Sequence, residues 1–251
     1  MAVKRSALMD DSIIKLRGLI GNAKRIVFFG GAGVSTESSI PDFRGKDGLY
    51  KARNEFGLSP ETLLSHEFFV RHPDVFYKYY RSTLSKTGYL PNKAHYALAK
   101  LEAEGKLTAV ITQNVDNLHQ MAGSKHVIEL HGSAYRNYCT KCGKSYSIDF
   151  INSYDGVPKC DCGAIVRPDV VLYGEQLDYD AIDEAIEELR SADLLIVGGT
   201  SLVVYPAAGL IDYYSGDELV LINKGETSYD SRASLVLHRS IGEVLSQAVD
   251  I

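Results

Sequence analysis

Residues 25–35 read Arg25-Ile26-Val27-Phe28-Phe29-Gly30-Gly31-Ala32-Gly33-Val34-Ser35. The apolar half of this stretch predicts a short buried strand, and the glycines end that strand abruptly. A glycine-rich turn after a strand lets the backbone approach a phosphate group closely. Gly31-x-Gly33 is weak evidence on its own, because an ordinary tight turn explains the same residues.

Similar short apolar runs follow, and they alternate with amphipathic helical segments. The predicted strands are 107–112, 127–130, 193–197 and 219–223, and the predicted helices are 12–21, 92–104 and 180–190. Strands that alternate with helices build a mostly parallel sheet with both faces covered. The sequence therefore predicts an α/β fold with a doubly wound, Rossmann-like sheet.

Two stretches interrupt this alternation. Residues 46–91 are rich in aromatic side chains and helical in pattern, and residues 136–167 contain all four cysteines. We interpret them as two inserts, one helical and one cysteine-bearing, that together form a smaller second domain. The Rossmann-like domain then comprises residues 1–45, 92–135 and 168–251.

The composition excludes several classes of function. Of 251 residues, 45% are hydrophobic, and 27 basic against 32 acidic residues give a formal net charge of −5. Without a long basic run, nucleic-acid binding is not expected. No apolar run approaches the roughly 20 residues that span a bilayer, and Asp10 and Asp11 precede any apolar stretch that could serve as a signal peptide. We expect a cytoplasmic monomer that binds neither nucleic acid nor membrane.

The glycine loop differs from that of a hydride-transferring dehydrogenase. Thr36 occupies the place of the third glycine in the dinucleotide fingerprint. A second strand that ends in an acidic ribose ligand should follow within about 20 residues, yet residues 38–45 read as a loop.

Several separate motifs together resemble the sirtuin family of NAD-dependent protein deacylases, in the family's order and through nearly the whole chain. They are Gly31-Ala32-Gly33-Val34-Ser35, Pro41-Asp42-Phe43-Arg44-Gly45, Thr112-Gln113-Asn114-Val115-Asp116, His131-Gly132, the cysteine cluster, Gly199-Thr200-Ser201-Leu202-Val203-Val204-Tyr205-Pro206 and Ile222-Asn223. The resemblance implies a bacterial-type deacetylase that uses NAD as co-substrate. It implies that acetyl groups leave protein lysine, giving nicotinamide, O-acetyl-ADP-ribose and free lysine.

His131 is the expected general base. In the reaction that the resemblance implies, the acyl oxygen attacks the ribose carbon that nicotinamide leaves, and a ribose hydroxyl must then lose a proton. Histidine titrates near neutral pH and suits this step. His131 directly follows a predicted strand, where doubly wound sheets bind ligands. The alternative is a strand-ending turn with the ring bonded to backbone.

The remaining cofactor residues are implied by the resemblance. Asn114 and Asp116 match the residues that hold the nicotinamide amide and ribose, which suits their donor and acceptor groups; either could also cap a helix. Arg44 suits a phosphate, and Phe43 could cover the reacting ribose. The other expected cofactor-binding residues are Gly31, Ala32, Gly33, Ser35, Thr36, Gln113, Val115, Gly199, Thr200, Ser201, Asn223 and Ile241.

The four cysteines suggest a metal site. Cys139-x-x-Cys142 and Cys160-x-Cys162 look like two knuckles that supply four thiolates to a tetrahedral zinc ion. The second pair departs from the family pattern, which usually has two intervening residues. A closed tetrathiolate leaves no position for a reacting water, so the zinc is expected to be structural. The alternative is a set of free thiols.

Substrate recognition is assigned to two loops that resemble those of the family. Residues 167–175 and 203–206 should enclose an acetylated peptide backbone as an added strand. The expected contacts are Phe43, Val171, Tyr173, Gly174, Glu175, Val204 and Tyr205. A protein ADP-ribosyltransferase on the same scaffold and a non-catalytic ADP-ribose or acyl-lysine binder are the rival interpretations. His131, Asn114 and Asp116 argue against the binder.

Acetyl is the expected acyl group. Relatives specialised for dicarboxylic acyl groups carry Tyr-x-x-Arg in the helical insert. Here Tyr80 follows Tyr77 at that spacing, and Arg81 comes one residue later. One residue rotates a helical side chain by about 100°, which should aim Arg81 away from the tunnel that Tyr77 would face. The alternative is a distorted helix in which Tyr79 and Arg81 form the pair.

Overall fold

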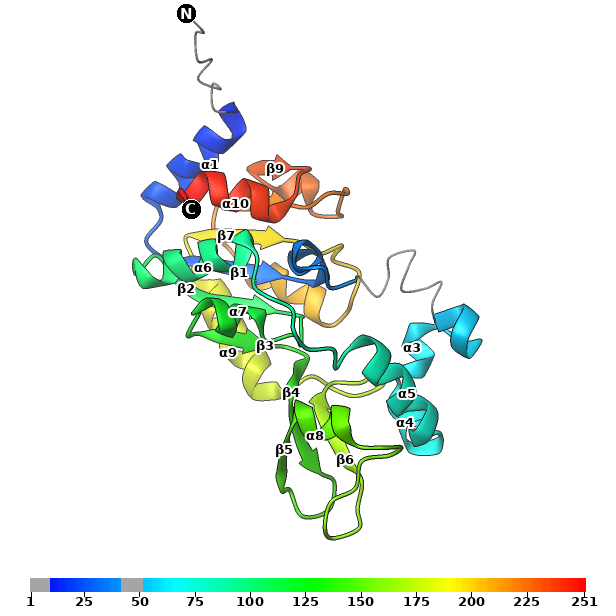
Figure 1. The fold of residues 1–251 in the computed structure, drawn as a ribbon. Coiled ribbons are helices and arrows are strands. Elements are labelled where there is room, and N and C mark those ends of the chain that lie inside the picture. Colours follow the sequence, from blue (N-terminus) through cyan, green and yellow to red (C-terminus); the bar gives the residue numbers. More distant parts are fainter. Residues whose placement is uncertain (1–9, 42–51) are drawn as a thin grey trace, which may run out of the picture.

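A parallel six-stranded sheet lies at the centre of the larger part of the molecule in the computed structural model, which describes residues 10–41 and 52–251 (Figure 1). Its strands are β1 (Ile26–Gly30), β2 (Leu107–Thr112), β3 (Val127–Glu129), β7 (Leu194–Gly198), β8 (Glu218–Ile222) and β9 (Leu235–Leu237). They lie in the order β3-β2-β1-β7-β8-β9, with every neighbouring pair parallel. By chain order this is 3-2-1-4-5-6, the arrangement of doubly wound nucleotide-binding sheets. The predicted fold class is confirmed.

Alternate residues of each strand face opposite sides of this sheet, because side chains in a strand alternate. Ile26 and Phe28 of β1 belong to the apolar core on one face, whereas Val27 and Phe29 belong to the core on the other. The first face is covered by α1 (Asp11–Asn22), α6 (Lys93–Ala103) and α10 (Ile241–Val249). The second is covered by α9 (Tyr179–Ser191) and the 3₁₀ helix η3 (Ala207–Tyr213).

A second, antiparallel sheet extends from the end of the large one, in the order β5-β4-β6 (Figure 1). It consists of β4 (Gly132–Cys139), β5 (Ser145–Ser147) and β6 (Val166–Val170) and is accompanied by α8 (Ile148–Ser153). The short helices α3 (Pro60–Leu63), α4 (His66–Arg71) and α5 (Pro73–Thr83) lie beside it.

One apolar core contains residues of both inserts. Phe69, Phe76 and Tyr77 of the helical insert are buried together with Ile151 and Val166 of the cysteine-bearing insert. This shared core is separate from the two cores of the large sheet. We propose on this basis that the two inserts form the small domain, with the boundaries expected from the sequence.

The remaining short elements join these parts. They are the 3₁₀ helices η1 (Ala32–Val34), η2 (Thr36–Ser38) and η4 (Asp230–Arg232), and the helix α7 (Leu118–Ala122). The sequence did not predict β4, β9 or α10, and the predicted strand at 107–112 coincides with β2.

In the part of the chain that the structure describes, none of the helices combines the length and apolar character needed to cross a membrane.

Candidate active site and metal centre

The predicted cofactor residues follow the carboxyl ends of the large sheet's strands. The glycine loop follows β1, residues 113–116 follow β2, residues 199–201 follow β7 and Asn223 follows β8. In a doubly wound sheet, ligands bind at this edge, where the strand order reverses. Here the reversal falls between β1 and β7, which places the glycine loop at the expected position.

Two glycines allow the loops after β1 and β7 to touch. The Gly33 N–H donates to the Gly199 carbonyl over 2.7 Å. A Cβ on Gly33 would lie 2.7 Å from the Gly199 Cα, and one on Gly199 would lie 2.4 Å from the Val34 nitrogen. Gly199 also has a φ of +61°, which side chains disfavour. The glycines are therefore required by packing and not only by a turn.

Ser35, Asn114 and Asp116 form a hydrogen-bonded group beneath the glycine loop. The Ser35 hydroxyl donates to Asp116 Oδ2 over 2.6 Å, and Asn114 Nδ2 donates to Ser35 Oγ over 3.1 Å. Burial raises the pKa of the Asp116 carboxyl, although hydrogen bonds from Ser35 and the Leu118 N–H oppose this shift. Asp116 Oδ1 also accepts from the Leu118 N–H at the start of α7 over 3.0 Å, so Asp116 also bonds to the first turn of that helix.

His131 lies between β3 and β4, and its ring is oriented by the loop after β2. Its Nδ1 is 2.9 Å from the Gln113 carbonyl oxygen. Because a carbonyl only accepts, Nδ1 carries the proton and Nε2 is the basic nitrogen. The His131 carbonyl accepts from the Val171 N–H over 3.0 Å, which ties the expected substrate loop to the same residue. Of the two sequence interpretations of His131, the backbone-bonded ring is observed and is compatible with a role as base.

A cleft of about 260 Å³ brings most of the predicted residues together. Of these, it is lined by Ala32, Ser35, Gln113, Asn114, Val115, Asp116, His131, Val171, Tyr173, Gly174, Glu175, Val204 and Tyr205. Gly31, Gly33, Thr36, Gly199, Thr200, Ser201, Asn223 and Ile241 do not line it. The predicted Phe43 and Arg44 lie outside the described residues.

Residues outside the cleft lining support the loops behind it. The Thr36 hydroxyl donates to the Gly33 carbonyl over 2.9 Å, and Gln113 Nε2 donates to Thr200 Oγ1 over 3.1 Å. Ile241, at the start of α10, is 3% exposed. Its Cδ1 lies 2.2 Å from the position that a Cβ on Gly198 would take, so Ile241 packs directly against the end of β7.

The Glu175 carboxylate is held by three segments of the chain. It accepts from both terminal nitrogens of Arg167 (2.8 and 3.0 Å) and from the Leu172 N–H (2.9 Å), and it lies 2.7 Å from His66 Nδ1. Burial raises the pKa of Glu175, but these partners outweigh burial and lower it to about 2. Glu175 thus fixes the loop at 171–175 against β6 and α4.

The helical insert contributes cleft walls that the sequence did not predict. Leu64, Leu84, Lys86 and Tyr89 line the cleft, as does Tyr135 of β4. The backbone of Tyr173 pairs with this insert, because its N–H donates to the Leu64 carbonyl and its own carbonyl accepts from the His66 N–H, each over 3.0 Å. The aromatic richness of the insert was the available signal, but it does not reveal which side chains face the cleft.

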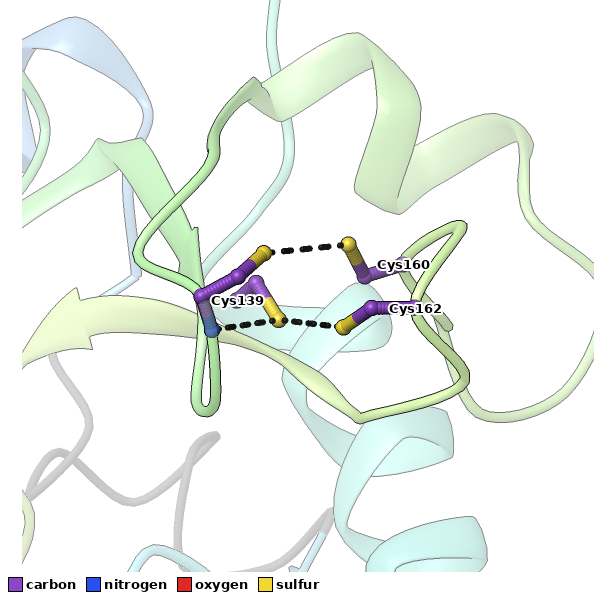
Figure 2. A group of neighbouring side chains, drawn as sticks. Cys139, Cys160 and Cys162 are labelled. Carbon is purple, nitrogen blue, oxygen red and sulfur yellow. Dashed lines mark hydrogen bonds between the residues drawn. The ribbon is translucent and has the colours of Figure 1, made fainter.

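The four cysteines converge on one point beside the small sheet, at the end of β4 and in the segment before β6 (Figure 2). Their sulfur atoms all lie within 4.8 Å of one another, with 3.4 Å between Cys139 and Cys162 and 3.6 Å between Cys142 and Cys160. A tetrahedron with metal–sulfur bonds of about 2.3 Å has edges of about 3.8 Å. The donor set therefore fits zinc, and none of the four thiols is in a disulfide.

Each pair of cysteines forms a knuckle that turns on a glycine with positive φ. Gly143 has a φ of +70° and Gly163 one of +83°. In the first knuckle the Lys141 and Cys142 N–H groups donate to Cys139 Sγ over 3.4 and 3.5 Å. The backbone N–H of Cys142 is the main cause that lowers the pKa of the Cys139 thiol to about 6, which favours the metal-binding thiolate. The shorter Cys160-x-Cys162 spacing still brings both sulfurs to the cluster.

A larger cavity of about 500 Å³ lies beside β3, β6 and α9. It shares Val170, Val171 and Glu175 with the cleft but contains neither His131 nor Asp116. We therefore place the candidate site in the smaller cleft, where the predicted base and cofactor residues meet.

Known proteins match this chain over most of its length. The model of the Sir2 family matches residues 31–206. An NAD-dependent protein deacetylase of Clostridium perfringens is 57% identical over 244 residues, which cover 96% of this chain and 100% of that protein.

Two solved structures share the fold as well. A Sir2 homologue in complex with NAD has a TM-score of 0.85 and 42% identity, covering 97% of this chain and 93% of that one. A Sir2 structure with an inhibitor, 2′-O-acetyl-ADP-ribose and a deacetylated p53 peptide has a TM-score of 0.82 and 40% identity, covering 94% and 97%. On this evidence, the chain belongs to the Sir2 family.

Proposed function

We propose that this chain is an NAD-dependent protein-lysine deacetylase, which yields nicotinamide, O-acetyl-ADP-ribose and free lysine. The observation that carries the proposal is the meeting of His131, Asn114 and Asp116 in one cleft between the glycine loop and the loop at 171–175. The relative from Clostridium perfringens is named for this activity, and the solved relatives hold NAD in one case and 2′-O-acetyl-ADP-ribose with a deacetylated peptide in another.

His131 serves as the general base. The Gln113 carbonyl holds the proton on Nδ1, so Nε2 is the nitrogen that can take a proton from a ribose hydroxyl. Bound NAD supplies the ribose carbon from which nicotinamide departs. Asn114 and Asp116 hold the nicotinamide amide and ribose, because their side chains combine amide donor and carboxylate acceptor groups in the same cleft.

The other predicted cofactor residues hold the phosphates and the adenosine. Residues 31–36 and the loop at 199–201 meet at the strand-order reversal, where phosphates bind in doubly wound sheets. Asn223 follows the neighbouring strand β8 and contacts the adenosine ribose in this proposal, with Ile241 behind it. Phe43 and Arg44 keep the roles expected from the sequence, at the reacting ribose and a phosphate.

The acetylated peptide lies between residues 171–175 and 203–206. Val171, Tyr173, Gly174, Val204 and Tyr205 line the cleft between these loops, and Glu175 shapes the first loop through Arg167.

The zinc holds the small sheet together. Four cysteines that must stay reduced to bind it favour the cytoplasm as the site of action, and we retain a monomer as the expected state.

The deciding experiment incubates the protein with NAD and an acetyl-lysine peptide and analyses all products by mass spectrometry. Deacetylated peptide with one acetyl-ADP-ribose per turnover is the expected result. A protein or peptide that gains the mass of ADP-ribose without losing acetyl would instead show an ADP-ribosyltransferase. Binding of NAD without any turnover would show a non-catalytic module.

A further inference from the structure

Asn92 connects the glycine loop to a helix that takes no direct part in the cleft. It is the N-cap of α6, where its Oδ1 accepts from the Ala94 N–H over 2.9 Å. Its Nδ2 points the other way and donates to the Val34 carbonyl over 2.8 Å and to Ser38 Oγ over 2.9 Å. One side chain therefore caps a helix and also holds two residues of the loop at 31–38.

The Val34 carbonyl lies at a sensitive place in that loop. Val34 closes η1, directly after the glycines, and its side chain is fully buried. The next residue is Ser35, whose hydroxyl reaches Asp116. A shift of the Val34 peptide group would therefore move Ser35 relative to Asp116, and it would also move the glycine loop that lies against the phosphates in the proposed function.

The same helix also reaches the second cofactor segment. The Asn92 N–H donates to His95 Nδ1 over 3.2 Å, and the His95 ring lies 4.7 Å from the ring of His119 on α7. Both rings are buried. His119 follows Leu118, the first residue of α7, whose N–H donates to Asp116 Oδ1. A continuous set of contacts therefore runs from the glycine loop through Asn92, His95 and α7 to Asp116.

We propose that Asn92 is a positioning residue for NAD binding, which holds the glycine loop in register with Asp116 through its bond to the Val34 carbonyl. This inference rests on the proposed function. Asn92 does not line the cleft, so its effect passes through the loop. In the proposed function, the loop contacts the same parts of NAD in the ground state and in the transition state. Loss of the hydrogen bond from Asn92 to the Val34 carbonyl should therefore raise the KM for NAD and leave kcat nearly unchanged.

The test uses two substitutions that preserve the helix cap. Asn92→Asp keeps an acceptor for the Ala94 N–H and adds a negative charge at a helix N-terminus, which is favourable there. It replaces the donor to Val34 by a carboxylate. Asn92→Ser also keeps a capping hydroxyl but is too short to bridge to the loop. Leaving a buried carbonyl without its donor should raise the KM and Kd for NAD roughly ten-fold.

Ser147→Asp is the matched control. Ser147 caps α8 in the small sheet, accepting from the Phe150 N–H, so this variant adds the same charge at an N-cap far from the loop. Steady-state kinetics with NAD and with peptide varied separately, calorimetric NAD titration and thermal unfolding are measured for all three variants. The expected result is that the KM and Kd for NAD rise in both Asn92 variants, while the peptide KM and kcat stay within about two-fold of the parent.

Each outcome decides the proposal. Unchanged NAD constants in both Asn92 variants, or equal rises in the peptide and NAD constants, would overturn it. If one variant unfolds, the other is judged alone, and unfolding of both would show that Asn92 serves the fold and not the cofactor. Because calorimetry measures NAD binding without turnover, an inactive parent that still binds NAD would refute the proposed function alone, while a parent that binds no NAD would refute both.

Discussion

Gly132 must lack a side chain so that β4 can pair with β6 directly after His131. Its φ is +72°, and a Cβ would lie 2.1 Å from the Asp169 carbonyl oxygen of the neighbouring strand β6. Any side chain would push β4 and β6 apart at the residue next to the proposed base. The His131-Gly132 pair is thus one unit, in which the glycine permits the strand contact and the histidine carries the chemistry.

We predict that Gly132→Ala destabilises the protein more than Gly105→Ala. Gly105 has a φ of +73° but open space around a Cβ, so alanine there meets only the left-handed backbone cost of about 1–2 kcal/mol. At Gly132 the clash adds to that cost. Urea unfolding of both variants measures the difference, and equal losses would show that β6 yields easily.

A second prediction at this scale concerns His131 itself. His131→Ala should abolish deacetylation while NAD-dependent exchange with free nicotinamide partly survives, because nicotinamide departs before a base is needed. Labelled nicotinamide and an acetyl peptide measure the two reactions on the same sample. Normal turnover by the well-folded variant would remove His131 from the proposed mechanism.

The two cysteine knuckles connect the metal site to the strands of the small sheet. Cys139 closes β4, and Cys160 precedes β6, so a bound ion links both strands. We predict one zinc per chain by elemental analysis. Alanine at any of the four cysteines should lower thermal stability and solubility together with zinc content. A stable variant that lacks zinc and is specifically inactive would point to a catalytic metal instead.

The loop at 171–175 is held by charge, which gives it a defined pH dependence. The pKa of Glu175 falls from 4.5 to about 2 in the folded chain. Its ionised form therefore stabilises the fold above pH 4.5, and this contribution is lost as the pH falls from 4.5 towards 2.

Glu175→Gln should remove this contribution. The difference in unfolding free energy between parent and Glu175→Gln is expected to be constant above about pH 5 and to shrink steadily below pH 4.5. Urea titrations at matched pH measure it, and other carboxylates cancel in the difference. A difference that does not change with pH would mean that Arg167 and His66 do not hold this carboxylate in solution.

At the scale of the whole molecule, the sequence predicted the large sheet well and the cleft walls poorly. Strands such as β2 are buried on both faces, and a continuous apolar run is a strong local signal. The motif residues cluster because parallel strands end at one edge, which topology alone predicts. The pairing of Tyr173 with Leu64 and His66 joins segments more than 100 residues apart, and no local pattern encodes such a contact.

The acyl preference depends on this long-range arrangement, and one expectation about it was wrong. Tyr77 does not face the cleft: its side chain is buried in the small core, and its hydroxyl donates to the Val166 carbonyl. Arg81 does point away, since its guanidinium donates to the Ile151 and Gly156 carbonyls over 2.9 and 2.6 Å. The end of α5 and the residues after it, including Thr83 and Leu84, line the cleft instead.

We therefore predict that acetyl-lysine is preferred to succinyl-lysine. Among the described residues that line the cleft, Lys86 is the one lysine or arginine and is exposed, whereas Glu61, Asp116 and Glu175 are acidic. A succinyl carboxylate would lose water without gaining a buried partner, and a missing charge-assisted bond costs about 1.5–3 kcal/mol, roughly ten- to a hundred-fold in kcat/KM. The measurement compares kcat/KM for one peptide that carries either acyl group, with Lys86→Met as a further variant. A higher value for the succinyl peptide that Lys86→Met abolishes would show that Lys86 recognises the carboxylate and would contradict the prediction.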